Sequence, residues 1–373
     1  MRIACVSDIS IGYGSPQMIF LLRSLARRAG GADQPLLIEP HQPSRPPRHE
    51  QFPDVEVVRI ETRRPAHHAV RTGRIEYLTR AARLLDERRP DVLVIPHAFC
   101  LPVLWELRRR PPLTIYYALE MPSPTGHDAE QERLNRLAAE KADLVLFPGY
   151  DRALLHIHRF GYGRLRCAAL YNAPPLSAEP VVPPAGRNGR ILYAGTLDDV
   201  YTGGGLYLDE RVQRFAIDLY GPLSGTNPRW KEQLRALAGN VRYLGYLDQA
   251  SLGRVRGEYA FSIVYWSPVR ENQFYACPNK FFESLAAGVP VVSAPHPQTR
   301  ELIEAHGCGI VLDDWSAEAF VRGLRQAAEL AGTERHAQMI ARCRAAHESE
   351  LNWEAQFRKV EPHLDELGVP RAS

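Results

Sequence analysis

Residues 278–292 read Pro-Asn-Lys-Phe-Phe-Glu-Ser-Leu-Ala-Ala-Gly-Val-Pro-Val-Val, and this stretch decides the fold. Asn279 is expected to cap a helix at its N-terminus, and Gly288 followed by Pro290 is a common way for a helix to end. Between them apolar side chains recur at helical spacing, and the two closing valines begin a short buried strand. The pattern therefore predicts a helix followed by a strand, the repeating unit of a layered α/β domain.

Two charged residues give this predicted helix a chemical meaning. Lys280 lies at its N-terminus, where backbone N–H groups and the helix dipole attract anions. Glu283 lies one turn further along, and a carboxylate there can accept hydrogen bonds from the paired hydroxyls of a sugar. From the residues alone, an ordinary helix–strand unit without a ligand is an equal alternative, because a fold does not fix a function.

The same stretch resembles the donor-binding segment of GT-B glycosyltransferases of the glycogen-synthase-like superfamily, family four and its relatives. The Pro-Asn-Lys-aromatic-aromatic-Glu run at 278–283 and the Ala-Ala-Gly-Val-Pro-Val-Val run at 286–292 carry the resemblance. It implies an α/β fold of two Rossmann-like domains facing each other across a cleft. It also implies transfer of a sugar from a nucleoside diphosphate sugar to an acceptor hydroxyl, with retention of configuration and without a metal. In this setting Glu283 would contact the nucleotide ribose and Lys280 the diphosphate.

Further donor-binding positions follow from the resemblance. Residues 190–196 and 215–222 are predicted strands that lead into glycine turns, and 241–247 resembles the segment that holds the nucleobase in relatives. Beside Lys280 and Glu283, the positions expected to bind the donor are Thr196, Gly221, Tyr246, Leu247, Pro278 and Asn279.

The chain departs from the family pattern at two places. The loop at 197–205 has no cation for the diphosphate and carries two aspartates, although its glycines could offer backbone N–H groups. Position 275, eight residues before Glu283, is Tyr where the family usually has a second Glu. More of the phosphate binding is therefore expected of Lys280, and the donor sugar does not follow from the sequence.

The first half of the chain opens with a strand, a glycine-bearing loop and a helix. Residues 3–6 are the predicted strand and 16–28 the amphipathic helix, as at the start of a doubly wound parallel sheet. Gly12 and Gly14 do not complete a dinucleotide fingerprint, because position 17 is Gln. The resemblance instead implies that these glycines lie between the donor phosphate and the acceptor.

Two predicted strands of the first half end in candidate catalytic residues. His97 ends the buried run 91–97, and Glu120 lies near the end of 113–122. Ligand sites in open α/β sheets gather at such carboxyl ends. Relatives often place a His at the first of these positions, near the reacting sugar, although a structural His remains an alternative. Glu120, where relatives often have His or Asp, is expected to act as a base toward the acceptor or only to orient it.

Changes in composition divide the chain into two domains. Residues 173–189 are rich in Pro and Gly and lack periodicity, which is typical of a linker. We predict an acceptor domain at 1–172, to which 350–373 cross back, and a nucleotide-sugar-binding domain at 190–349. A chain of 373 residues is long enough for two such domains.

Composition narrows the class of protein and its location. A hydrophobic content of 45% with 24% charged residues is that of a soluble globular protein, and a net charge of +3 is too small to indicate nucleic-acid binding. Six scattered cysteines without a C-x-x-C pair, and histidines without ligand spacing, predict neither a metal site nor a disulfide framework. No apolar run approaches the roughly 18 residues of a membrane span, and the first residues resemble a strand rather than a signal peptide. A cytoplasmic location is expected.

The expected partners are a nucleotide sugar, with UDP favoured slightly over GDP, and a hydroxyl-bearing small molecule, glycolipid or saccharide. No cofactor is expected, and the arginine-rich first half leaves room for a peripheral membrane contact. Two alternatives remain open. One is a nucleotide-sugar epimerase of the same fold, and the other is a non-catalytic protein that binds a nucleotide or a partner.

Overall fold

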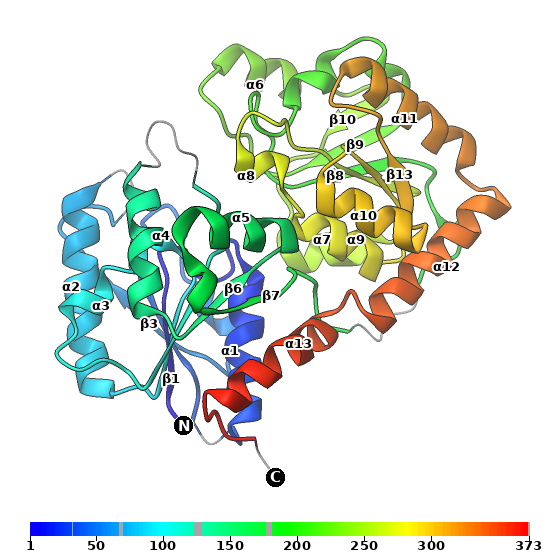
Figure 1. Cartoon of the computed structure of the whole chain (residues 1–373). Helices are drawn as coiled ribbons and strands as arrows, with labels where there is room; N and C mark the ends of the chain where they lie inside the picture. Colours follow the sequence, from blue (N-terminus) through cyan, green and yellow to red (C-terminus); the bar gives the residue numbers. More distant parts are fainter. Residues whose placement is uncertain (32, 67–69, 123–128, 177–180, 372–373) are drawn as a thin grey trace. The chain divides into compact units, whose positions relative to one another are not determined.

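The computed structural model describes residues 1–31, 33–66, 70–122, 129–176 and 181–371. The chain forms two compact units: unit 1 comprises Met1–Tyr171 and Phe357–Ser373, and unit 2 comprises Asn172–Gln356 (Figure 1). The predicted linker at 173–189 is counted within unit 2. The chain returns to unit 1 later than the predicted residue 350, because the first turn of the last helix still belongs to unit 2.

Unit 1 is built on a parallel sheet that contains seven strands within the described residues. Their order across the sheet is β3-β2-β1-β4-β5-β6-β7. The strands are β1 Ile3–Val6, β2 Leu36–Pro40, β3 Glu56–Ile60, β4 Val92–Ile95, β5 Leu113–Tyr117, β6 Leu144–Phe147 and β7 Arg166–Ala169. The order reverses between β1 and β4, the point at which open α/β sheets form ligand sites.

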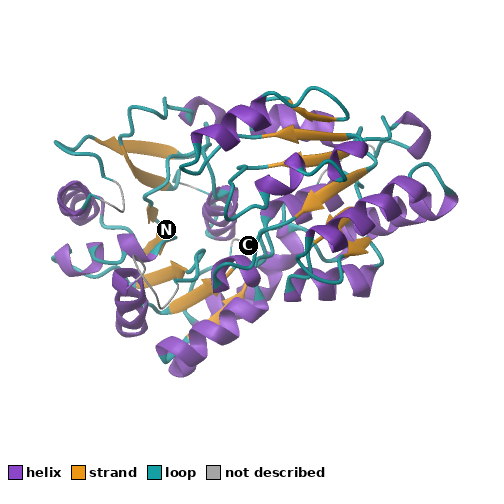
Figure 2. Ribbon diagram, turned by 90° about the horizontal axis from the view of Figure 1, so that it is seen from above, coloured by secondary structure: helices purple, strands orange, loops and turns teal. Residues whose placement is uncertain are grey.

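Helices flank the strands of this sheet (Figure 2). Their buried side chains form the core together with those of the strands. The helices of unit 1 are α1 Pro16–Arg28, α2 Arg71–Arg88, α3 Val103–Glu106, α4 Ala129–Lys141, α5 Tyr150–Phe160 and most of α13 Trp353–Glu366, with short 3-10 turns at η1 His49–Gln51, η2 Ala98–Cys100 and η4 Tyr162–Arg164. On α2 the buried face includes Tyr77, Leu78 and Ala81, which recur at the spacing of a helix.

Unit 2 repeats the same plan with six parallel strands in its described part. The strand order is β10-β9-β8-β11-β12-β13, with the reversal between β8 and β11. The strands are β8 Ile191–Ala194, β9 Ile217–Tyr220, β10 Val241–Tyr243, β11 Phe261–Val264, β12 Val291–Ser293 and β13 Gly309–Val311. Both units thus have the Rossmann-like arrangement that the sequence predicts.

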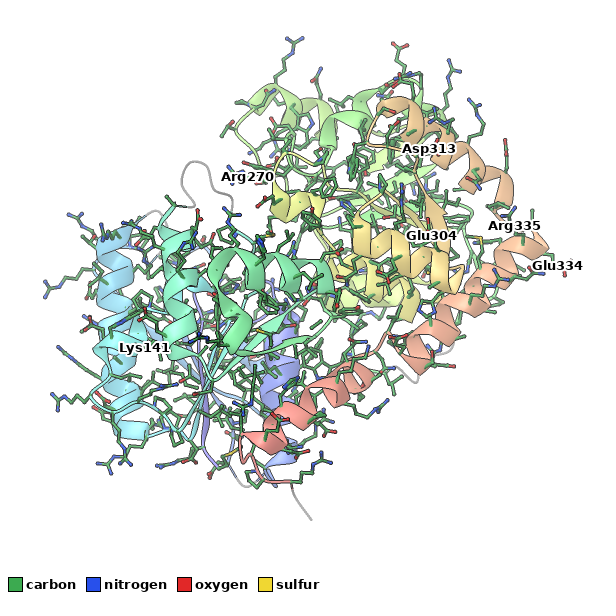
Figure 3. The ribbon with its side chains drawn as sticks, viewed as in Figure 1. Lys141, Arg270, Glu304, Asp313, Glu334 and Arg335 are labelled. Atoms are coloured by element: carbon green, nitrogen blue, oxygen red, sulfur yellow. The ribbon has the colours of Figure 1, made fainter. Side chains whose placement is uncertain are left out.

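The helices of unit 2 separate an apolar face from a charged one. They are α6 Pro228–Arg235, α7 Gln249–Arg256, α8 Glu271–Phe274, α9 Asn279–Ala286, α10 Pro297–His306, α11 Ala317–Leu330 and α12 Glu334–Ser349, with 3-10 turns at η5 Pro184–Gly186, η6 Gly204–Leu208 and η7 Val212–Arg214. Glu334 and Arg335 extend outward from the start of α12, whereas His336 and Met339 are buried (Figure 3). This alternation is the mark of a helix packed on one side.

Helix α9, the helix of the deciding stretch, differs from the prediction at its start and agrees at its end. Pro278 is the N-cap and Asn279 the first helical residue, so the expected capping by Asn279 is wrong. Proline at this position has an extended backbone that leads into the helix. At the other end Gly288 has φ +66° and its N–H donates to the Leu285 carbonyl at 2.9 Å, which is the predicted glycine stop.

Candidate functional site

Lys280 lies buried in the first turn of α9, with its ammonium group on an aromatic ring. Its Nζ is 3.8 Å from the ring centroid of Tyr193, a fully buried residue of β8. Burial and the nearby charge of Arg256 lower the pKa of Lys280 to about 7, while Glu283 acts in the opposite direction. An anion beside this amine would favour its protonated form.

Two glycines at the ends of β8 and β9 bring the backbone close to Lys280. Gly195 has φ +143° and Gly221 φ +140°, a region that other residues rarely adopt. A Cβ added to Gly221 would lie 1.8 Å from the Gly195 carbonyl oxygen, and one added to Gly195 would lie 3.1 Å from Lys280 Nζ. Thr196 comes next, and its carbonyl accepts a hydrogen bond from the Tyr193 hydroxyl at 2.8 Å. Gly221, Gly195 and Lys280 therefore form one contiguous surface.

Glu283 is held by two side chains of α7. Arg256 donates to its Oε2 at 2.6 Å, and the Gln249 amide donates to its Oε1 at 2.8 Å. The guanidinium is 3% exposed and the carboxylate side chain 16%. A cavity of about 210 Å³ beside this cluster is lined by Gln249, Arg256 and Glu283, together with Val181 and Val182 of the segment that leads into unit 2.

The loop after β8 is built by its own polar groups. Asp198 accepts hydrogen bonds from the backbone N–H groups of Val200 and Tyr201 at 2.8 and 2.9 Å. The Gly204 N–H donates to the Asp198 carbonyl at 3.0 Å, and a Cβ on Gly204 would lie 2.4 Å from the Trp230 ring. Gly204 is therefore needed for packing against Trp230. Its N–H is already used within the loop, although the sequence suggested that the glycines of this loop could offer their N–H groups to a phosphate.

The other expected donor residues lie on neighbouring loops. The Gly221 N–H donates to the Gly245 carbonyl at 2.8 Å, which joins the turn after β9 to the segment that carries Tyr246 and Leu247. Tyr246 is 54% exposed, while Leu247 packs against a small cluster that includes Leu192. At the start of α9, Pro278 is buried and Asn279 partly buried.

In unit 1, an acid and a histidine meet where the strand order reverses. Asp8 follows β1 and His97 follows β4, and Nδ1 of His97 lies 2.7 Å from Oδ1 of Asp8. Burial by itself would lower the pKa of His97, but the charges of Asp8 and Glu120 outweigh it and raise the pKa. Glu120 is exposed just after β5, the strand beside β4. The predicted pair His97 and Glu120 thus belongs to one electrostatic cluster.

The glycines of the first loop have structural reasons of their own. Gly12 has φ +80°, its carbonyl accepts a hydrogen bond from Arg48 at 3.0 Å, and a Cβ there would lie 2.9 Å from Arg48 Cδ. Glu39 accepts a hydrogen bond from the Ile11 N–H at 2.5 Å and so fixes the same loop. Gly14 does not have a left-handed backbone. A Cβ added to it would lie 3.7 Å from a methyl group of Ile9, an ordinary contact.

Part of unit 2 matches a known protein family. Residues 189–329 match the family model described as "Glycosyl transferases group 1", and this range holds β8, α7 and α9. The chain has the GT-B fold of two Rossmann-like domains, and its second unit carries a segment that matches a glycosyltransferase family. A search of curated protein sequences found no match.

Solved structures that resemble this chain support the GT-B fold over nearly its full length. The HepE protein of Anabaena, crystallised with UDP, is 15% identical over 98% of this chain and 100% of its own, with a TM-score of 0.74. The sucrose-phosphate synthase of Thermosynechococcus elongatus is 16% identical over 99% of both chains, with a TM-score of 0.71. The lipopolysaccharide outer core galactosyltransferase WaaB, in its apo form, is 13% identical over 98% of this chain and 99% of its own, with a TM-score of 0.66.

Three residues of these two clusters were missed by the sequence reasoning. Arg256 and Gln249 lie 27 and 34 positions before Glu283, and no spacing rule links them to it. Asp8 could have been found, because it follows the first strand at the sheet edge where His97 also lies.

Two further features concern the residues that the structure describes. They include no group of three or more His, Cys, Asp or Glu side chains that could hold a metal ion. None of the helices that the structure describes has the length and apolar character needed to cross a membrane.

Proposed function

We propose that this glycosyltransferase moves a sugar from a nucleoside diphosphate sugar to an acceptor hydroxyl, with retention and without a metal. One observation carries the proposal: Lys280 and Glu283 lie one turn apart on α9, and Lys280 faces the glycine turn at the end of β8. HepE, a protein of similar fold, was crystallised with UDP-glucose, which supports a UDP-sugar as the donor.

On the donor side, the proposed roles follow from charge and access. The Lys280 ammonium would neutralise the charge that develops on the diphosphate leaving group, an electrostatic stabilisation of the transition state. Gly195 lacks the side chain that would fill the space beside this amine, and Gly221 lacks the one that would collide with Gly195. Glu283 would accept hydrogen bonds from the ribose hydroxyls, and the segment with Tyr246 would hold the base.

On the acceptor side, unit 1 offers the cluster of Asp8, His97 and Glu120. Glu120 is the exposed member and would orient the acceptor hydroxyl or take its proton. His97, whose pKa Asp8 raises, would present a hydrogen-bond donor to the sugar. A small molecule, glycolipid or saccharide all fit this role. A cytoplasmic location is proposed on separate grounds, because all six cysteines are free thiols.

The proposal is tested by measuring release of nucleoside diphosphate from a panel of UDP-, GDP-, ADP- and dTDP-sugars, with and without acceptor sugars and glycolipids. We expect release from one class of donor, accelerated by an acceptor and reduced at least tenfold or so in Lys280→Met, because one charged contact to a phosphate is lost. Tight donor binding without turnover on any acceptor would favour the non-catalytic alternative. Interconversion of two nucleotide sugars without an acceptor would favour the epimerase.

A further inference from the structure

The Glu283 carboxylate accepts hydrogen bonds from residues at both ends of helix α7. Gln249 is the first residue of α7 and Arg256 its last, and each donates to a different oxygen of the carboxylate. Because α7 spans only these eight residues, the two contacts fix the carboxylate relative to a single rigid element. The orientation of Glu283 is therefore set by α7 and not by α9 alone.

Arg256 and Gln249 differ in how they could respond to a ligand. The Arg256 guanidinium is almost fully buried and also lies 3.4 Å from the Ser284 hydroxyl, which donates to the Lys280 carbonyl at 2.6 Å. A buried ion pair adds little net stability compared with a well-packed apolar pair, so stability alone does not account for it. Gln249 is exposed, and its amide can turn away into solvent.

The bond from Gln249 has the chemistry of the bond expected from a sugar. The amide donates one N–H to Oε1 at 2.8 Å, as a ribose hydroxyl would donate its O–H. Oε2 stays bound to the guanidinium, which leaves the second oxygen turned toward Gln249. One oxygen of the carboxylate thus stays bound to Arg256, while the other can exchange its hydrogen bond from Gln249 for one from a ligand.

We propose that Arg256 is a positioning residue that fixes Glu283 for the donor ribose, and that the Gln249 amide occupies the place of a ribose hydroxyl until the donor displaces it. The inference rests on the proposed function, because it takes a ribonucleotide as the ligand. Selectivity for the ribose hydroxyls then depends on the side chains of Glu283, Arg256 and Gln249. A ligand without these hydroxyls leaves the bond from Gln249 in place.

The test compares the dissociation constants of UDP and 2′,3′-dideoxy-UDP by titration calorimetry on the full chain. The wild type is expected to prefer UDP by about tenfold or more, the range for a hydrogen bond to a charged group. In Arg256→Met this preference should fall to nearly one. In Gln249→Ala it should grow several-fold, because UDP no longer competes with the amide while the dideoxy ligand gains nothing.

Two controls separate positioning from loss of structure. Arg254→Met removes the same charge from the exposed face of α7 and should leave the preference unchanged. The double variant Arg256→Met/Glu283→Gln avoids leaving the partly buried carboxylate without its ion-pair partner, and it should fold while still lacking the preference. Arg256→Lys, which keeps the charge, should recover part of the preference.

The outcomes are distinct. A wild type that binds neither nucleotide overturns the proposed function and this inference with it. A wild type that prefers UDP, with the same preference in Arg256→Met and in Gln249→Ala, overturns this inference and leaves the proposed function standing.

Discussion

At the scale of single residues, the molecule places ionisable groups in surroundings that move their pKa toward neutrality. Lys280 is buried against Tyr193 with Arg256 nearby, and His97 is buried against Asp8. In both cases burial disfavours the charged form and so acts to lower the pKa. For Lys280 the neighbouring cation adds to burial, whereas for His97 the neighbouring carboxylate overcomes it.

The lowered pKa of Lys280 predicts a pH dependence of donor binding. Free Lys280 loses its proton near pH 7, and a bound diphosphate favours the protonated amine, so binding takes up a proton above that pH. The affinity for UDP-glucose should therefore fall by up to about tenfold per pH unit as pH rises above about 7. Calorimetry in buffers of different ionisation enthalpy measures this uptake. Lys280→Met should bind more weakly and without this slope, and an identical slope in the variant would contradict the assignment.

The pair in unit 1 predicts a change in the titration of His97. Asp8→Asn removes the carboxylate that raises the pKa of His97, and burial then lowers it below its ordinary value. NMR titration of the imidazole signals should show the fall. The sign for stability is fixed as well. The raised pKa contributes to stability at low pH, and this contribution is lost as pH rises through the folded-state pKa, so the variant should lose more stability at about pH 5 than at about pH 9. An unchanged imidazole titration would show that Asp8 does not control His97.

At the scale of elements, the sequence predicted regular segments well and the contacts between them poorly. The strands and the glycine stop of α9 follow from apolar runs and from the φ that Gly288 needs. The predicted N-cap at Asn279 is wrong because Pro278, whose backbone is extended, is the N-cap and Asn279 is already helical. The hydrogen bonds from α7 to Glu283 were missed because they join two helices that are separated in the sequence. Periodicity contains no information on such pairs.

The touching glycine turns predict a large effect from a small substitution. Gly221→Ala would place a Cβ 1.8 Å from the Gly195 carbonyl oxygen at φ +140°, so both the clash and the backbone strain destabilise unit 2. A loss of about 2 kcal/mol or more is expected in chemical denaturation. Gly205→Ala is the matched control, because its Cβ would meet nothing within 4 Å and it should change stability by about 0.5 kcal/mol at most. Equal losses in the two variants would show that the close approach is not what requires glycine.

At the scale of the whole molecule, the chain contains two parallel sheets with the same kind of strand-order reversal, and the Asp8–His97 pair lies at the reversal in unit 1. The sequence contained this plan, since both halves begin with a strand and a glycine-bearing turn and only one half carries the Pro-Asn-Lys-Phe-Phe-Glu run. The acceptor and the donor sugar do not follow from it. Those specificities depend on surface loops, whose side chains obey no periodic rule.

The central claim, that a nucleoside diphosphate binds at Lys280, is tested most directly by thermal stabilisation with UDP, GDP, ADP and dTDP on the wild type and Lys280→Met. A ligand at about a hundred times its dissociation constant adds roughly 2.7 kcal/mol to the free energy of unfolding. We predict that one nucleotide, UDP, raises the midpoint of the wild type and raises that of Lys280→Met much less. No shift with any nucleotide, or an equal shift in both proteins, would contradict the claim.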